Sequence, residues 1–138
     1  MPVGGARPKP PGQAVTRTPR LEFTEVPDRP YGGRPMPKRK DGRRWPRGMV
    51  ETWRGWSRMP HCILWTDTDW AFAVESLHVA ARTVESLSDS KWFAELRQRQ
   101  RVMGTTLDAR RDLRIRYVPV EVPKARSEVV ELDEYRAL

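Results

Sequence analysis

Arginine and lysine side chains are the residues of this sequence best suited to chemistry, and they gather in two runs. One run covers residues 38–44, and the other is spread over residues 91–116, which hold eight basic and three acidic side chains. The planar guanidinium group fits two oxygens of a phosphate, so runs of this kind are typical of proteins that bind a phosphate backbone. The residues that we expect to contact DNA are Lys38, Arg39, Lys40, Arg43, Arg44, Arg97, Arg99, Arg101, Arg110, Arg111, Arg114 and Arg116.

The alternative for the second run is a solvated helix face crossed by ion pairs. Glu95 and Arg99 have the four-residue spacing at which opposite charges meet on a helix, and so do Asp112 and Arg116. These two pairs would neutralise only part of the charge, so phosphate binding stays a separate prediction for this run.

Residues typical of catalysis are sparse in comparison. His61 and Cys62 are adjacent, but a zinc site needs three or four ligands at suitable spacings, and the only other histidine is His78. Asp67 and Asp69 could form a carboxylate pair for Mg²⁺, although a helix cap explains both of them better. No glycine-rich segment ends in the Gly-Lys-Ser/Thr of a phosphate loop. The sequence therefore predicts a protein that is not an enzyme and that has neither a metal nor another cofactor.

The overall composition favours a polyanionic partner. The formal net charge of +8 over 138 residues and the pI near 10.4 suit nucleic acid or an anionic membrane surface. Cys62 is the only cysteine, so no internal disulfide can form, and an intracellular setting is favoured. No apolar run approaches the roughly 18 residues of a membrane span, and the Pro/Gly-rich opening does not read as a secretory signal.

Proline, glycine and charge divide the chain into three parts. Residues 1–44 hold 9 of the 13 prolines, 6 of the 9 glycines and 11 of the 26 basic side chains against 4 acidic ones. Without an apolar repeat, such a segment cannot bury enough surface to offset its ordering entropy. We therefore expect a disordered or extended basic arm over residues 1–44, a helical core and oligomerisation domain over residues 45–118, and a C-terminal tail over residues 119–138. The tail is expected to start extended, and its end to form either a short helix that docks on a partner or a loose segment.

Apolar periodicity predicts an all-α domain built on an antiparallel helical hairpin. The first helix of the hairpin is expected over about residues 67–87, with no glycine or proline in its apolar stripe. Thr66 and Asp69 have the spacing of a capping box, and Trp65 and Trp70 flank them as a hydrophobic staple. The second helix is expected after the short turn at residues 88–90, which forces the two helices to run antiparallel.

Shorter helical segments are expected on both sides of the hairpin. A short helix should lie between Pro46 and Pro60, because apolar residues recur there at helical spacing although two glycines weaken it. Gly104 suits the C-terminus of the second hairpin helix, after which an apolar face continues through Asp108–Tyr117. A single long helix through Gly104 is the alternative.

Six tryptophans in so short a chain need partners. A helical unit of about 70 residues cannot easily bury so many rings alone, so self-association would cover the surplus. Stacking of bases on an exposed tryptophan is the alternative. The residues expected in the core and in oligomer contacts are Trp53, Trp56, Trp65, Trp70, Leu77, Trp92 and Leu96.

Parts of this sequence resemble the small terminase subunits of tailed phages, in particular those of actinobacterial hosts. One is the run from Trp65 to Trp70 followed by a helical hairpin. Another is the stretch from Leu96 to Arg114, with its Gly-Thr-Thr-Leu turn at Gly104 and its Arg-rich end in Arg-Asp-Leu. The basic Pro/Gly-rich opening is also similar, although the turn lacks the proline that family members often carry. The resemblance covers about residues 1–118.

The resemblance implies a role in viral DNA packaging. Such subunits are helical, assemble as homo-oligomeric rings, bind viral double-stranded DNA and hand it to the terminase large subunit, which holds the ATPase and the nuclease. The place of action would be the cytoplasm of the bacterial host cell.

The alternative is a small basic transcription regulator or an RNA-associated protein, although no clean helix-turn-helix is visible. Under either DNA-binding hypothesis, affinity should fall steeply with added salt. Deletion of residues 1–44 is expected to weaken that salt dependence while leaving the helical signal intact.

Overall fold

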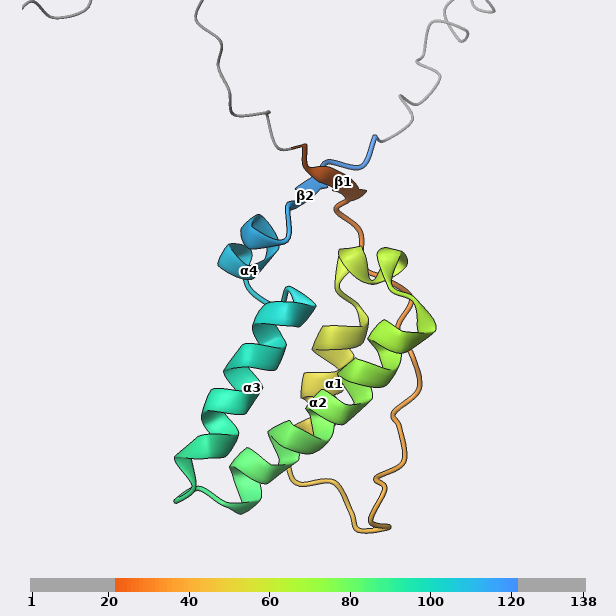
Figure 1. Cartoon of the computed structure of the whole chain (residues 1–138). Helices are drawn as coiled ribbons and strands as arrows, with labels where there is room; N and C mark the ends of the chain where they lie inside the picture. Colours follow the sequence, from red (N-terminus) through yellow and green to blue (C-terminus); the bar gives the residue numbers. More distant parts are fainter. Residues whose placement is uncertain (1–21, 122–138) are drawn as a thin grey trace, which may run out of the picture.

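A computed structural model describes residues 22–121 as a helical domain with a two-stranded ribbon at one end (Figure 1). Helix α2 packs against both α1 and α3, and α4 leads from the end of α3 to the ribbon. The expectations for residues 1–21 and 122–138 lie outside the described residues. The elements in chain order are β1 (Thr24–Pro27), α1 (Met49–Ser57), a 3₁₀ helix (Pro60–Leu64), α2 (Asp67–Glu85), α3 (Ser90–Met103), α4 (Leu107–Asp112) and β2 (Ile115–Val118).

Helix α2 begins where its capping residues predict. The Asp69 carboxylate accepts the backbone N–H of Thr66 at 2.8 Å and the Thr66 hydroxyl at 2.9 Å. The rings of Trp65 and Trp70 meet with their centroids 4.8 Å apart. The capping box and the hydrophobic staple are therefore both formed. The prediction of a long helix from Asp67 is confirmed, with its end two residues earlier than expected.

Helix α3 runs back along α2, as the short connection between them requires (Figure 1). The Asp89 side chain accepts the N–H of Lys91 at the start of α3. Gly104 ends the helix with φ 73°, a left-handed conformation that costs glycine little. The Thr106 hydroxyl then accepts the N–H of Ala109 at 3.2 Å and starts α4. The helix therefore ends at Gly104, and the alternative of one long helix is wrong.

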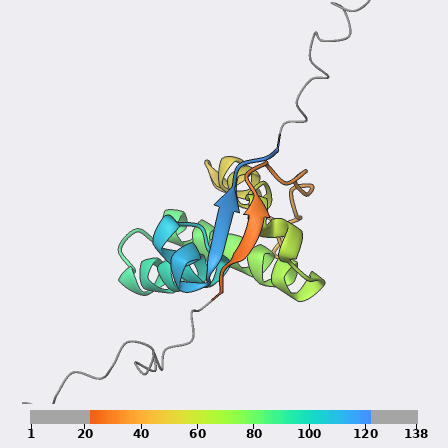
Figure 2. The ribbon, with the colours of Figure 1, turned by 90° about the horizontal axis from the view of Figure 1, so that it is seen from above.

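The all-α prediction is wrong in one respect, because β1 and β2 form a parallel two-stranded sheet. Thr24 lies opposite Ile115 in the register, and Figure 2 shows the two strands side by side over the ends of the helices. The helix expected to reach Tyr117 ends at Asp112 instead. β-Branched and aromatic residues of β2 favour extended backbone, and the strand that pairs with them lies near the other end of the chain.

Residues 28–45, which we call the strap, run extended along the helices from β1 to the start of α1 (Figure 1). The indole N–H of Trp53 donates to the Arg34 carbonyl oxygen at 3.0 Å, and that of Trp45 donates to the Pro37 carbonyl oxygen at 2.9 Å. Of the two alternatives expected for residues 1–44, the extended one describes the strap, which also packs on the helices. Extended proline-rich backbone has no internal hydrogen bonds, so its carbonyl oxygens are free to accept from tryptophan.

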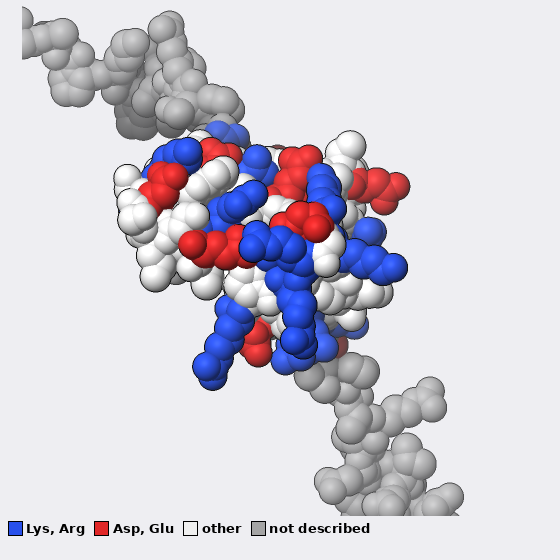
Figure 3. Space-filling view, turned by 90° about the horizontal axis from the view of Figure 1, so that it is seen from below, with Lys and Arg blue, Asp and Glu red and all other residues white. Residues whose placement is uncertain are grey.

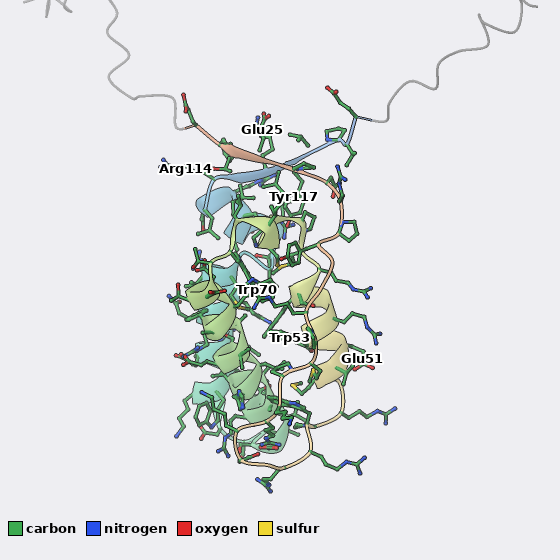
Figure 4. All side chains as sticks on the ribbon, turned by 90° about the vertical axis from the view of Figure 1, so that its right-hand side faces the viewer. Glu25, Glu51, Trp53, Trp70, Arg114 and Tyr117 are labelled. Carbon is green, nitrogen blue, oxygen red and sulfur yellow. The ribbon has the colours of Figure 1, made fainter. Side chains whose placement is uncertain are left out.

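The aromatic core lies between the strap, α1 and α2. Trp53 and Trp70 point toward each other with their ring centroids 6.2 Å apart (Figure 4). Tyr31 of the strap lies 5.7 Å from Trp70 on the same measure. The strap thus covers aromatic surface that was expected to need a second subunit. Of the other residues expected in the core, Trp56 and Leu77 are buried, and Trp65, Trp92 and Leu96 are half-buried.

Candidate nucleic-acid interface

The first basic run lies on a loop at the end of the domain opposite the ribbon (Figure 1). Arg39 of this loop faces inward, with only 8% of its surface exposed. Its guanidinium group contacts the Glu85 carboxylate at 2.6 and 2.9 Å and the Asp41 carboxylate at 3.1 Å, and it donates to the Arg44 carbonyl oxygen at 2.9 Å. Arg39 therefore joins the loop to the last turn of α2, and four of its five N–H donors have partners inside the protein.

Two further contacts hold the same loop against α2. The backbone N–H of Lys40 donates to Nε2 of His78 at 3.1 Å, while Nδ1 of His78 donates to the Val74 carbonyl oxygen at 2.9 Å. The His78 ring also packs against Trp45, with ring centroids 4.8 Å apart. The loop is thus ordered before any ligand arrives, which reduces the entropy that binding would cost.

The other basic side chains of the loop are exposed, and three neighbours extend them into a cluster that we call the basic end. Figure 3 looks at this end and shows Lys and Arg side chains spread over it, with Asp and Glu side chains between them. The members of the basic end are Lys38, Lys40, Arg43, Arg44, Arg47, Arg82 and Lys91. The last three were not among the predicted site residues. Arg82 near the end of α2 and Lys91 near the start of α3 reach this end through the hairpin turn. The predicted turn was the only feature of the sequence that indicated their position.

Carboxylates inside the basic end moderate its charge without cancelling it. The backbone N–H of Arg43 donates to Asp41 at 3.0 Å and lowers the pKa of that carboxyl, with help from the nearby arginine charges. The hydrogen bond from Arg39 lowers the pKa of Glu85 in the same way. Both carboxylates are therefore ionised at neutral pH. A third carboxylate, Asp89, pairs with Lys91 at 3.4 Å. The seven exposed cations still outnumber these three carboxylates, so the surface remains positive.

The fold turns two arginines of the second basic run inward. Arg99 contacts Glu95 at 2.8 Å, which confirms the predicted helical pair, and its guanidinium carbon lies 4.8 Å from the Phe72 ring centre. Arg110 donates to the Gly104 carbonyl oxygen at 3.1 Å. These two guanidinium groups, like that of Arg39, have partners inside the protein, so we no longer place them at a DNA interface.

The remaining arginines of the second run are exposed but lie apart from the basic end. Arg101 pairs with Asp112 at 3.6 Å, so the predicted pair between Asp112 and Arg116 is not formed. Arg111 pairs with Asp108 of its own helix. Arg114 lies beside the ribbon, at the far end of the domain (Figure 4). Of the second basic run, the structure therefore brings Lys91 into one surface with the first run but not the exposed arginines.

His61 and Cys62 are buried parts of the fold. His61 is 1% exposed, with Nε2 2.7 Å from the Met103 carbonyl oxygen and Nδ1 2.6 Å from the Tyr117 hydroxyl. A carbonyl oxygen only accepts, so Nε2 carries the proton and the Tyr117 hydroxyl donates to Nδ1. His61 thereby ties the 3₁₀ helix to the end of α3 and to β2. Burial raises the pKa of the Cys62 thiol to about 12, so this cysteine is not a thiolate nucleophile at neutral pH.

This histidine should make the stability of the domain depend on pH. Burial, and then the charge of Arg110, lower the pKa of His61, so the folded chain binds the proton less readily than the unfolded chain. The contribution of His61 is complete above the ordinary histidine pKa of about 6.5 and is lost as the pH falls below it. We expect the free energy of unfolding, measured by urea titration, to be lower at pH 5.5 than at pH 7.5. The His61→Gln variant should show a weaker pH dependence, and equal dependences would contradict this assignment.

The described residues offer little for catalysis. Among residues 22–121, no three His, Cys, Asp or Glu side chains lie close enough together to hold a metal ion. Asp67 and Asp69 lie in the first turn of α2, where they face the positive end of the helix dipole. No helix within this range combines the length and the apolar sequence needed to cross a membrane.

The fold and the site together define a small helical domain with a cluster of exposed cations at one end. The family model described as phage terminase small subunit matches residues 3–138, so the chain belongs to the phage terminase small subunit family. No curated protein and no solved structure matches the chain.

Proposed function

We propose that this protein binds viral double-stranded DNA as a homo-oligomeric ring and delivers it to the terminase large subunit for packaging in the host cytoplasm. The match of the family model over residues 3–138 is the observation that carries this proposal. In this division of labour, the large subunit supplies the ATPase and the nuclease, and the small subunit is a non-catalytic DNA-binding component.

The basic end supports the DNA-binding part of the proposal. Its exposed cations lie on one face and come from three separate segments, which suits contacts to several phosphates of a duplex. Such contacts release counterions, so the affinity for DNA should fall steeply as salt is added. The sequence of the DNA would matter little for these contacts, because phosphates carry no base information.

Exposed apolar side chains, rather than tryptophans, support the oligomeric part of the proposal. Leu87 at the hairpin turn is 75% exposed, Ile63 of the 3₁₀ helix is 64% exposed, and Leu107 of α4 is 59% exposed. We propose these side chains as contacts with neighbouring subunits of the ring.

Light scattering with mass determination tests the ring directly. We expect the purified protein at micromolar concentration to have a mass several times the 16.1 kDa of one chain, and to shift further when duplex DNA is added. A stable monomer would contradict the ring. A protein that bound no duplex at low salt would contradict the DNA-binding role, whatever its mass.

A further inference from the structure

A pocket of about 260 Å³ lies within the basic end, between the loop of the strap and the facing ends of α2 and α3. Its walls are Val79 and Arg82 of α2, Trp92 of α3, and Lys40 of the loop. Pockets that enclose drug-sized molecules have volumes of roughly 300–1,000 Å³. This smaller pocket therefore suits one planar ring rather than a larger molecule.

The pocket combines an apolar surface with cations at its rim. Trp92 is half-buried, so part of its indole remains accessible, and the Lys91 ammonium, which pairs with Asp89 at 3.4 Å, lies 5.2 Å from the ring centre. Lys40 and Arg82 are exposed at the rim. Asp41 also borders the pocket, but Arg39 contacts its carboxylate at 3.1 Å. The pocket thus presents an aromatic face beside free positive charge.

Both nitrogens of the remaining wall residue, His78, are already used. Nδ1 donates to the Val74 carbonyl oxygen, and Nε2 accepts from the backbone of Lys40. His78 is therefore a fixed wall of the pocket and not a ligand-binding group. Recognition in this pocket must come from stacking and from phosphate binding.

We propose that this pocket binds one unpaired nucleotide of DNA, with its base against Trp92 and Val79 and a phosphate on Lys40 and Arg82. Inside a duplex, both faces of a base are stacked on its neighbours, and even at a blunt end the base stays paired, whereas the base of a single-stranded end is free to enter the pocket. The proposal rests on the DNA-binding function and adds a preference for DNA with an unpaired end.

Fluorescence anisotropy with three labelled DNAs tests the proposal. These are a blunt duplex, the same duplex with a short single-stranded overhang, and the single strand alone. We expect the wild-type protein to bind the overhang duplex more tightly than the blunt one. The Trp92→Leu variant, which keeps an apolar side chain but removes the stacking surface, should lose about tenfold in affinity for the overhang and the single strand. It should bind the blunt duplex as the wild type does.

Two variants serve as controls, with thermal unfolding followed by circular dichroism to check that each is folded. Trp92→Phe keeps an aromatic face and should retain most of the overhang preference. Phe93→Ala removes the next aromatic residue, which is exposed and does not line the pocket, and should change nothing.

Several outcomes would overturn the proposal. Equal affinities of the Leu and Phe variants would show that stacking on Trp92 does not contribute. Blunt-duplex binding without an overhang preference would overturn the pocket assignment alone and leave the proposed function intact, whereas no binding to any of the three DNAs would overturn both. Tighter binding of an RNA strand than of the DNA strand of the same sequence would overturn the choice of DNA.

Discussion

Removal of residues 1–44 should abolish the cooperative unfolding transition of the helical domain, whereas removal of residues 1–21 should preserve it. The longer deletion removes β1 and almost all of the strap. With them go the partner of β2, the carbonyl oxygen that accepts from Trp53, and the ring of Tyr31 that covers Trp70. The shorter deletion removes none of these contacts. This replaces the expectation that the longer deletion would leave the helical signal intact.

The size of the effect follows from what the longer deletion uncovers. Val26, 1% exposed, and Arg39, paired with Glu85 and Asp41, are lost together with the cover over two tryptophans. Each uncovered or unpaired group of this kind costs on the order of 1–3 kcal/mol. Their sum approaches the whole stability of a typical domain, about 5–15 kcal/mol.

Urea unfolding followed by circular dichroism at 222 nm gives the measurement for both deletions. A matched substitution, Arg39→Met, removes the ion pairs of the strap with Glu85 and Asp41 without shortening the chain. It should lower the urea midpoint of unfolding but leave a cooperative transition. If the protein without residues 1–44 unfolds with the same midpoint as the full chain, the strap is not part of the cooperative unit.

The parts of this fold that the sequence predicts correctly depend on neighbouring residues. The capping box between Thr66 and Asp69 and the left-handed stop at Gly104 are both decided within a few residues. The ribbon could not be found in this way, because Thr24 and Ile115 are far apart in the sequence. The packing of the strap on the helices could not be predicted for a related reason. The strap's carbonyl oxygens accept from Trp53 of α1 and from Trp45 at its own end, and such contacts leave no periodic pattern in the sequence.

The candidate site shows the same division between local and long-range information. The cluster of cations at residues 38–44 is visible in the sequence and is exposed in the structure, with the exception of Arg39. Nothing local distinguishes Arg39 from Arg43, because its burial depends on Glu85, which is 46 positions further along the chain. Arg82 and Lys91 join the basic end only through the turn of the hairpin. Residue type therefore predicts a phosphate ligand, and tertiary structure decides which arginines are exposed to meet one.

Replacement of Lys40, Arg43 and Arg44 by glutamine should lower the affinity for duplex DNA by about one to two orders of magnitude at low salt. Each lost phosphate contact removes about 0.9 from the slope of log affinity against log salt, so the slope should become shallower by up to about three. All three side chains are exposed, and the contacts that order the loop use the backbone of Lys40 and the side chain of Arg39. The free energy of unfolding should therefore change little. Anisotropy titrations over a series of salt concentrations measure both affinity and slope.

The matched control replaces three exposed arginines of the second run, Arg97, Arg111 and Arg114, by glutamine. Both triple variants lose the same net charge, so a change in the overall field of the protein would affect them equally. A much larger loss in the loop variant therefore locates the phosphate contacts at the basic end. A larger loss in the control would move the interface to α3 and α4, and the pocket beside Trp92 would then lie away from the bound duplex.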